Sequence, residues 1–327
     1  MSFELILPFL RPIEPLLLDE SVSEIMGNPD STWWYEREGR VRQDKTIFFD
    51  ASKLRTGLEV IANQLGHKLG EDNAQLQAHL PDGSRIQAWI PPVVSPAPAL
   101  SIRKFTSRNY TMNDLIARGT LTQPLADLMG GLVRSGKTVL ISGGTGTGKT
   151  TLLRILADSI DDEERLVVIE DTPELQIKKP NIVPARSLSD TFHADVSFDA
   201  LLRGALRFRP DRIILGEIRG VEARTLLDSL NTGHSGSLAT IHANSAAKAL
   251  TRFANLVMRS HSQATFSDTE AEIGEAIEYV VHVAREPGRR TVREVLRLNG
   301  YDRNSQRYLM EHVYEAGSPD FAKVKPC

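Results

Sequence analysis

Short apolar runs alternate with longer amphipathic stretches through the second part of the chain. The runs predict buried β-strands at residues 138–142, 166–169, 212–215 and 238–241. The stretches between them carry apolar residues at helical spacing, as residues 152–156 do after the first strand. Strands that alternate with helices are typical of a largely parallel sheet that is covered on both faces. The pattern therefore predicts an α/β domain.

The pattern changes near the C-terminal end of this region. Strand-like segments occupy residues 279–284, 291–298 and 308–314, with turn signals at Pro287-Gly288 and Asn299-Gly300 between them. Closely spaced strands joined by such turns form antiparallel hairpins. We therefore expect an antiparallel meander of these three segments, followed by a loosely ordered tail after Gly317.

The first part of the chain mixes helix-like and strand-like patterns on a smaller scale. Residues 33–35 and 46–49 predict strands, and residues 54–69 predict an amphipathic helix. No combination of residues in this part indicates catalysis. We therefore expect a small α+β domain here.

Prolines mark the predicted boundary between the two regions. They accumulate in residues 91–99, and proline fits neither the interior of a helix nor a central strand. The sequence therefore predicts an N-terminal domain over residues 1–92, a linker over 93–101 and a second domain over 102–327.

Composition limits the classes of protein to consider. A chain of 327 residues with 41% apolar residues can bury two ordinary cores, and no stretch approaches the ~20 continuous apolar residues of a membrane span. The formal net charge of −3 provides no overall basic field, so no sequence-specific nucleic-acid partner is predicted. The only cysteine, Cys327, excludes a disulfide framework and a cysteine-based zinc site. The N-terminal apolar patches are broken by prolines and lack a basic start, so we expect packing onto the first domain or peripheral membrane contact rather than a signal peptide.

A glycine-rich turn follows the first predicted strand of the second domain. It reads GGTGTGKTT and matches the pattern G-x-x-x-x-G-K-[ST], in which backbone N–H groups and a helix N-terminus hold phosphates. Lys149 would reach the β- and γ-phosphates, and Thr150 would bind Mg²⁺. The predicted nucleotide-binding residues of this turn are Gly143, Gly144, Thr145, Gly146, Thr147, Gly148, Lys149, Thr150 and Thr151. A glycine-rich turn that carries a surface lysine is the alternative interpretation.

Carboxylates follow two other predicted strands. Glu170, Asp171 and Glu174 come after strand 166–169, and Glu217 comes after strand 212–215 with a glycine before it. Phosphoryl transfer to water requires a metal ion and a group that orients the water, and acids at strand ends near a phosphate cradle are suited to both tasks. We assign Glu217 to the magnesium–water network, although such strands ordinarily end in Asp. An acidic turn that caps a helix is the alternative for the first group.

Small residues and two histidines surround the last predicted parallel strand. Residues 231–244 read NTGHSGSLATIHAN. Glycines permit a close approach of the backbone to phosphate, and a histidine can hydrogen-bond the γ-phosphate. His234 and His242 are therefore candidates, although a structural role fits each of them alone. The histidine spacing does not indicate a metal site.

Taken together, these segments resemble one family, the hexameric secretion ATPases of type II and type IV secretion, conjugation and type IV or Tad pili. Its Walker A loop, acidic box, Gly-Glu Walker B strand and histidine box are similar, in this order, to residues 143–151, 169–175, 207–220 and 232–244. The conjugal-transfer and Tad branch is favoured by segments similar to its own at residues 23–41, 82–92 and 101–105, and the conjugal branch in particular by residues 273–296. The four-cysteine zinc module of many type II members is not encoded here.

The resemblance implies a RecA-like P-loop NTPase domain with a mostly parallel sheet, preceded by a smaller α+β, PAS-like domain. It implies ATP and Mg²⁺ as ligands and a homohexamer with ATP between the two domains of each subunit. Its implied catalytic residues are Glu217, Glu170, Lys149 and His242, with Glu217 preferred over Glu170 and His242 over His234. Its implied metal ligands are Thr150, Glu217 and Asp171, and Glu174 completes the acidic box.

Arginines complete the expected site, because a planar and permanently charged group suits a phosphate oxygen in the transition state. Arg103 is the residue of the N-terminal domain that the resemblance places at the nucleotide. Arg186, Arg207 and Arg219 are further candidates for an arginine finger, and each also fits a structural ion pair.

The expected function is that of a cytoplasmic ATPase, peripherally associated with the inner membrane, that energises a type IV secretion or conjugal-transfer machine. Inner-membrane secretion or pilus proteins would be its partners, and hydrolysis would move one domain against the other across residues 91–101. The alternatives are a nucleotide-dependent assembly switch, a Tad-type pilus assembly ATPase and a nucleic-acid motor. The acidic net charge and the lack of an aromatic-basic stretch disfavour the last of these.

Overall fold

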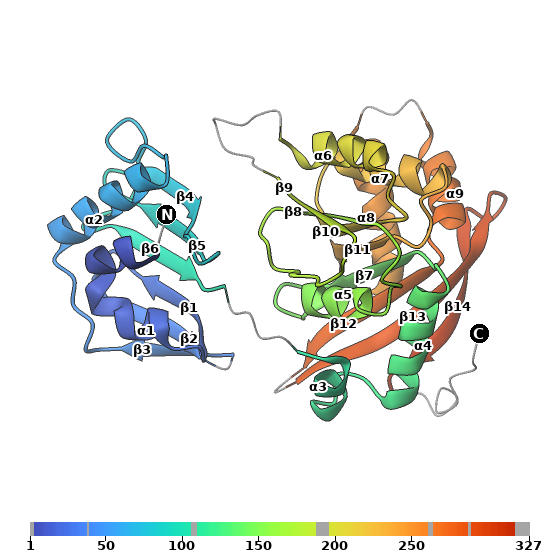
Figure 1. The fold of residues 1–327 in the computed structure, drawn as a ribbon, viewed down its shortest axis with the longest axis horizontal. Helices are drawn as coiled ribbons and strands as arrows, with labels where there is room; N and C mark the ends of the chain where they lie inside the picture. The colour runs from blue at the N-terminus through green and yellow to red at the C-terminus, as the bar shows by residue number, and fades with distance from the viewer. Residues whose placement is uncertain are drawn as a thin grey trace. The chain divides into compact units, whose positions relative to one another are not determined.

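The computed structural model describes residues 3–37, 39–105, 110–187, 196–260, 264–286 and 289–317. The chain divides into two compact units, Met1–Arg108 and Asn109–Cys327 (Figure 1). Cys327, the tail after Gly317 and the predicted turn Pro287-Gly288 lie outside the described residues. In the part of the chain that is described, no helix is long and apolar enough to cross a membrane.

The first unit is built on a six-stranded antiparallel sheet with the strand order β3-β2-β1-β6-β5-β4. Its strands are β1 (Val22–Gly27), β2 (Trp33–Arg37), β3 (Arg40–Asp44), β4 (Gln75–His79), β5 (Arg85–Trp89) and β6 (Ala99–Arg103). The helical elements of this unit are η1 (Phe3–Leu5), η2 (Leu7–Ile13), α1 (Glu14–Leu18) and α2 (Ala51–Gln64).

Helices cover one face of this sheet and leave the other face uncovered by helices of this unit. Leu58 and Ile61 of α2 belong to one buried cluster with Ile13 of η2 and with inward-facing strand residues such as Ile25 and Ile102. Side chains alternate between the two faces of a strand, so the opposite face carries polar residues such as Gln87 together with Trp34 and Trp89. The first unit is therefore a two-layer α+β domain, as the sequence predicted.

Two local predictions in this unit have different outcomes. The predicted strand at 33–35 is part of β2, and the predicted helix at 54–69 corresponds to α2. The predicted strand at 46–49 is wrong, because these residues form an irregular segment between β3 and α2. Its aromatic residue Phe49 packs instead against the ring of Trp33, with ring centroids 4.8 Å apart.

The structure also corrects the predicted domain boundary. The prediction placed a linker at residues 93–101, but β6 (Ala99–Arg103) pairs with β1 on one side and β5 on the other. The predicted linker and hinge therefore include half of a central strand of the first unit, and the units divide between Arg108 and Asn109. The prolines lie in the connection between β5 and β6, so they mark a loop within the first unit and not the boundary between the units.

The second unit contains an eight-stranded sheet with the order β14-β13-β12-β7-β11-β10-β8-β9. Its strands are β7 (Val139–Gly143), β8 (Leu166–Glu170), β9 (Ile182–Arg186), β10 (Arg212–Ile218), β11 (Leu238–His242), β12 (Tyr279–Glu286), β13 (Arg289–Asp302) and β14 (Arg307–Glu315). Strands β12, β7, β11, β10, β8 and β9 are parallel to one another, and β13 and β14 add an antiparallel edge. The predicted meander is thus confirmed, but the predicted turn at Asn299-Gly300 is wrong, because both residues lie inside β13 and the chain turns at residues 303–306.

Helices cover both faces of this sheet, as Figure 1 shows. On one face lie α3 (Met112–Ala117), α4 (Gln123–Arg134) and α5 (Lys149–Ala157), which share a buried cluster with alternate strand residues such as Ile141 and Val168. On the other lie α6 (Phe198–Ala205), η3 (Leu206–Phe208), α7 (Glu222–Asn231), α8 (Ala246–Met258) and α9 (Phe266–Ala276), packed on residues such as Leu140 and Ile169. The second unit is the predicted three-layer α/β domain.

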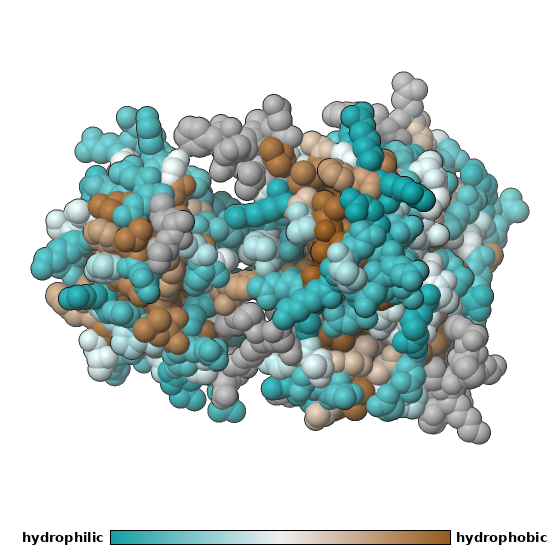
Figure 2. Space-filling model, in the orientation of Figure 1, coloured by the Kyte–Doolittle hydropathy of each residue, from teal (hydrophilic) through white to brown (hydrophobic). Residues whose placement is uncertain are grey.

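Burial on both faces explains why the strand signals were clear. All five residues of β7 and of β8 are buried, because helices cover both sides of these central strands. Hydrophilic residues cover most of the face of the second unit that Figure 2 shows.

Candidate functional site

The sequence motifs meet at the carboxyl ends of four neighbouring parallel strands. The glycine loop follows β7, Glu170 ends β8, Glu217 lies near the end of β10, and His242 ends β11. These strands are adjacent in the order β7-β11-β10-β8. Because parallel strands point the same way, their carboxyl ends form one edge of the sheet, where ligands of α/β proteins bind.

The glycine loop has the backbone geometry of a phosphate cradle. Gly146 and Gly148 adopt positive φ angles of 69° and 95°, which glycine tolerates far better than other residues. A Cβ on Gly143 would lie 2.4 Å from the carbonyl oxygen of Val283, so this position also requires glycine. Helix α5 begins directly after the loop, at Lys149, and directs its N-terminal N–H groups and partial positive charge toward the loop.

Two side chains of the loop bond back to its own backbone. The ammonium group of Lys149 donates to the carbonyl oxygen of Gly144 at 2.8 Å, and only 7% of this residue is exposed. The hydroxyl of Thr147 donates to the same oxygen at 3.0 Å. A carbonyl group of the loop therefore holds the lysine side chain in a buried position.

An arginine links the acidic box to the Walker B carboxylate. Arg219 donates through one amino group to Asp171 and through the other to Glu217, both at 2.6 Å. The second oxygen of Glu217 lies 3.0 Å from Nε2 of His242. Three segments that are far apart in the sequence thus share one network. Half of the Arg219 side chain is exposed, so water can reach this network.

Burial changes the pKa of two groups in the site. It raises the pKa of Glu170 to about 7, although the carboxylate accepts hydrogen bonds from the N–H groups of Glu174 and Leu175 at 3.0 Å each. Burial lowers the pKa of His242, with a smaller opposing effect from Glu217 and a further lowering by Lys149 and Arg219. Perturbed acid–base groups of this kind gather at functional sites. The shifts in the pKa of Glu170 and His242 thus both favour the uncharged form of the side chain.

The glycine before Glu217 has a packing reason. A Cβ on Gly216 would lie 3.0 Å from Cβ of Glu170, on the neighbouring strand β8. The Gly-Glu ending of β10 therefore lets the buried Glu170 side chain pack against the backbone of β10. The hydroxyl of Thr240 on β11 donates to the carbonyl of Gly216 at 2.6 Å and fixes the same peptide from the other side.

The remaining candidates lie on other elements, and one of them, Arg186, contacts the acidic box. His234 lies before β11, at the opposite edge of the sheet, where its ring is 3.2 Å from the carbonyl of Ser229. Arg207 is exposed in η3. Arg186 lies at the end of β9 and donates to the backbone carbonyl of Asp171 at 3.2 Å. Arg103 is exposed on β6 of the first unit and lines a hollow of about 220 Å³ with Arg85.

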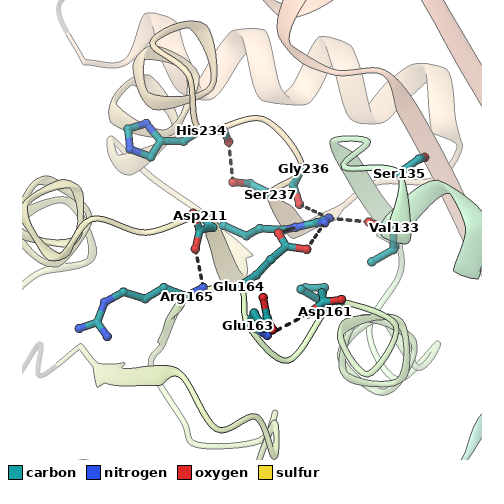
Figure 3. A network of polar contacts seen from close by, with 12 residues as sticks. Val133, Ser135, Asp161, Glu163, Glu164, Arg165, Asp211, His234, Gly236 and Ser237 are labelled. Carbon is teal, nitrogen blue, oxygen red and sulfur yellow. Dashed lines mark hydrogen bonds and ion pairs between the residues drawn. The ribbon is translucent and has the colours of Figure 1, made fainter.

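A second polar network lies at the amino ends of the same strands (Figure 3). Arg212, the first residue of β10, donates to both oxygens of Glu164 at 2.5 and 2.6 Å. The same guanidinium donates to the backbone carbonyls of Val133 and Gly236. Arg212 is 3% exposed, whereas the side chain of its partner Glu164 is 27% exposed. No sequence motif pointed to it.

The donors at the carboxyl edge fit a magnesium ion that is brought by a nucleotide. Within the described ranges, no group of three or more His, Cys, Asp or Glu residues is arranged to hold a metal ion by itself. Mg²⁺ at such sites is held by one or two carboxylates, phosphate oxygens and water, so a complete protein cage is not required. The hydroxyl of Thr150 and the carboxylates of Glu217 and Asp171 are hard oxygen donors of this type.

The fold and this edge define a P-loop domain of the RecA-like class. Residues 10–309 match the sequence profile of the family described as Type II/IV secretion system protein. The chain therefore belongs to this family.

Individual relatives agree with the assignment. The conjugal transfer protein TrbB of Rhizobium radiobacter is 36% identical over 302 residues, which cover 90% of this chain and 88% of the relative. The type IV secretion system protein VirB11 of Bartonella quintana is 32% identical over 330 residues, which cover 89% and 92% of the two chains. The crystal structure of the ATPase DotB of Legionella pneumophila has the same fold, with a TM-score of 0.64, 20% identity and coverage of 91% of this chain and 81% of that one.

Proposed function

We propose that this protein hydrolyses ATP with Mg²⁺ and that this reaction energises a type IV secretion or conjugal-transfer machine. The observation that carries the proposal is the convergence of the glycine loop, two strand-end glutamates and His242 at one edge of the sheet. Membership of the family and the similarity to proteins named for conjugal transfer and type IV secretion support the transport role.

Each group of residues at this edge has a separate role in the proposed hydrolysis. Lys149 and the N–H groups of residues 143–151 bind the phosphates, and His242 donates a hydrogen bond to the γ-phosphate. Mg²⁺, when bound with the nucleotide through Thr150, Glu217 and Asp171, neutralises charge that develops on the phosphates. Glu217 orients the attacking water, and Glu170 is the second candidate for this role. An arginine from Arg103, Arg186, Arg207 or Arg219 completes the charge balance.

The proposed working state is a homohexameric ring with ATP bound at each subunit. Its partners are inner-membrane proteins of the secretion machine, and its place is the cytoplasmic face of that membrane. The similarity to a conjugal transfer protein, 36% identity in an alignment that covers 90% of this chain, supports conjugal transfer as the process.

The decisive variant is Glu217→Gln, because it keeps the shape of the side chain and removes its negative charge. Phosphate release should fall about 100-fold or more, as for the loss of a positioned base or water-orienting group, while ATP binding persists. DNA transfer by a strain that carries only this variant should stop. Undiminished phosphate release would contradict the role of Glu217, and the parallel variant Glu170→Gln would then identify the second candidate.

A nucleotide-dependent assembly switch is the second candidate function. The observation that bears on it is the pairing of Arg219 with both Asp171 and Glu217, because ion pairs that exchange partners can couple nucleotide binding to a change of state without turnover. A switch that is held in its ATP form by Glu217→Gln would keep binding its partner and would keep much of the transfer activity. A Tad-type pilus assembly ATPase would instead lose pilus formation and leave DNA transfer intact.

A further inference from the structure

The C-terminal meander lies against the glycine loop. Strand β12 runs parallel to β7, with Val283 opposite Gly143, the last residue of β7. Where the chain of β7 turns into the loop, β12 continues through Ala284 and Arg285. A Cβ on Gly146 would lie 3.8 Å from a guanidinium nitrogen of Arg285, which places that arginine beside the middle of the loop.

The next strand of the meander contacts the loop directly. Nε of Arg290, on β13, donates to the carbonyl oxygen of Gly146 at 3.0 Å, across 144 residues of sequence. The stem of Arg290 also lies beside the loop, because a Cβ on Gly148 would be 3.5 Å from its Cδ. Arg290 thus bonds to one positive-φ glycine of the loop, Gly146, and lies beside the other, Gly148.

This hydrogen bond fixes the direction of one peptide group. In a trans peptide the C=O and N–H groups point in opposite directions. The carbonyl of Gly146 points toward Arg290, so the N–H of Thr147 points away from Arg290. Glycine at position 146 leaves this peptide easy to rotate, and a restraint on the carbonyl reduces the cost of ordering it when a phosphate binds.

The charges of the hairpin are distributed unevenly. Arg285 and Arg290 are directly opposite each other in the β12–β13 register, and like charges at such positions repel. The next pair, Glu286 and Arg289, forms an ion pair at 2.7 Å that Arg293 joins from the same strand as Arg289. An anion held in the adjacent loop would offset the repulsion between the two arginines.

We propose that Arg290 is a positioning residue of the nucleotide site and that Arg285 and Arg290 together provide a positive charge that attracts the phosphates. The proposal rests on the nucleotide binding proposed above. It assigns the C-terminal meander a part in binding that the sequence motifs do not indicate.

The test measures the affinity of the purified full-length protein for ADP and ATP with Mg²⁺. Arg290→Ala should weaken the binding of both nucleotides about tenfold, as expected for a lost charge-assisted hydrogen bond and a less ordered loop. It should raise KM in proportion and leave kcat within about twofold, because the groups that act on the γ-phosphate are unchanged. Arg290→Lys should recover part of the affinity, and the double variant with Arg285→Ala should lose more than either single change.

The matched control is Arg289→Ala, which removes the same charge from the same hairpin but an arginine that pairs with Glu286. Its affinity for ADP should stay within about twofold of the wild-type value. An unchanged affinity in Arg290→Ala, or an equal loss in Arg289→Ala, would overturn the proposal. If the wild-type protein binds no nucleotide at all, the proposed function fails instead, so the two failures are distinguishable.

Discussion

An arginine lies at each end of strand β10, and the two arginines have contrasting environments. Arg212 begins the strand, is 3% exposed and meets one glutamate and two backbone carbonyls. Arg219 follows the other end of the strand, has a half-exposed side chain and bridges Glu217 and Asp171. The local sequences, RPDRII and GEIRG, do not reveal this difference.

The two edges of the sheet differ in how much it costs to break their ion pairs. At the amino edge, the bonds of Arg212 join the end of α4, the loop before β8 and the loop before β11. A buried charge without its partners is costly, so that network has to stay intact. At the carboxyl edge, the ion pairs of the half-exposed Arg219 cost less to break, so they would exchange partners on the proposed binding of nucleotide and Mg²⁺.

The largest expected effect is on stability, at the amino edge. Arg212→Ala should lower the free energy of unfolding of the second unit by about 3 kcal/mol, because Glu164 loses its partner and two carbonyls lose their donor. Trp33, Trp34 and Trp89 all lie in the first unit, so tryptophan fluorescence reports the unfolding of that unit, whereas far-UV circular dichroism reports both.

In urea unfolding of the whole chain, the dichroism transition should shift and the fluorescence transition should not. Arg203→Ala is the control, because its ion pair with Asp199 leaves 70% of the arginine side chain exposed and should contribute less than about 1 kcal/mol. If Arg212→Ala were as stable as this control, the amino edge of the sheet would not contribute more to stability than an exposed ion pair does.

The next effect is a pH dependence at the carboxyl edge. In the folded state the pKa of Glu170 is raised to about 7 from 4.5, so the folded protein binds more protons than the unfolded chain between these values. The protonated carboxyl therefore favours folding at low pH, and this contribution falls as pH rises toward 7, by about 3 kcal/mol in total.

Glu170→Gln should remove this dependence, since the amide oxygen can still accept from the N–H groups of Glu174 and Leu175. Without nucleotide or Mg²⁺, the variant should gain stability relative to the wild-type protein as pH increases from 5 to 8. A stability difference that stays constant over this range would show that Glu170 is not protonated in the folded protein.

The smallest effect on stability is expected at the exposed end of β10. Arg219→Ala should change the free energy of unfolding by less than about 1 kcal/mol, yet phosphate release should fall about tenfold because Glu217 and Asp171 lose their common partner. Arg219→Lys keeps the charge but cannot contact both carboxylates with a rigid fork, so it should be intermediate. A loss of stability as large as that of Arg212→Ala would remove the distinction between the two edges.

Much of the fold follows from patterns that are local in the sequence. The strands at 138–142, 166–169, 212–215 and 238–241 were predicted within a few residues, because β-strands buried on both faces leave long apolar runs. The boundary at 93–101 was wrong because prolines report only the local backbone, whereas the place of β6 depends on its pairing with β1 and β5. Phe49 was misassigned for the same reason, since its partner Trp33 is remote in sequence.

The sequence by itself determined the phosphate-binding loop, the acidic residues at the strand ends and the order in which these motifs follow the parallel strands. Each of these features depends on spacing within a few residues. Only the tertiary structure decided that Arg219 joins Asp171 to Glu217, that Gly216 makes room for Glu170, and that Arg290 contacts the loop. These contacts join strands whose order in the sheet differs from their order in the chain. The energy of burial and pairing, rather than the local sequence, selects them.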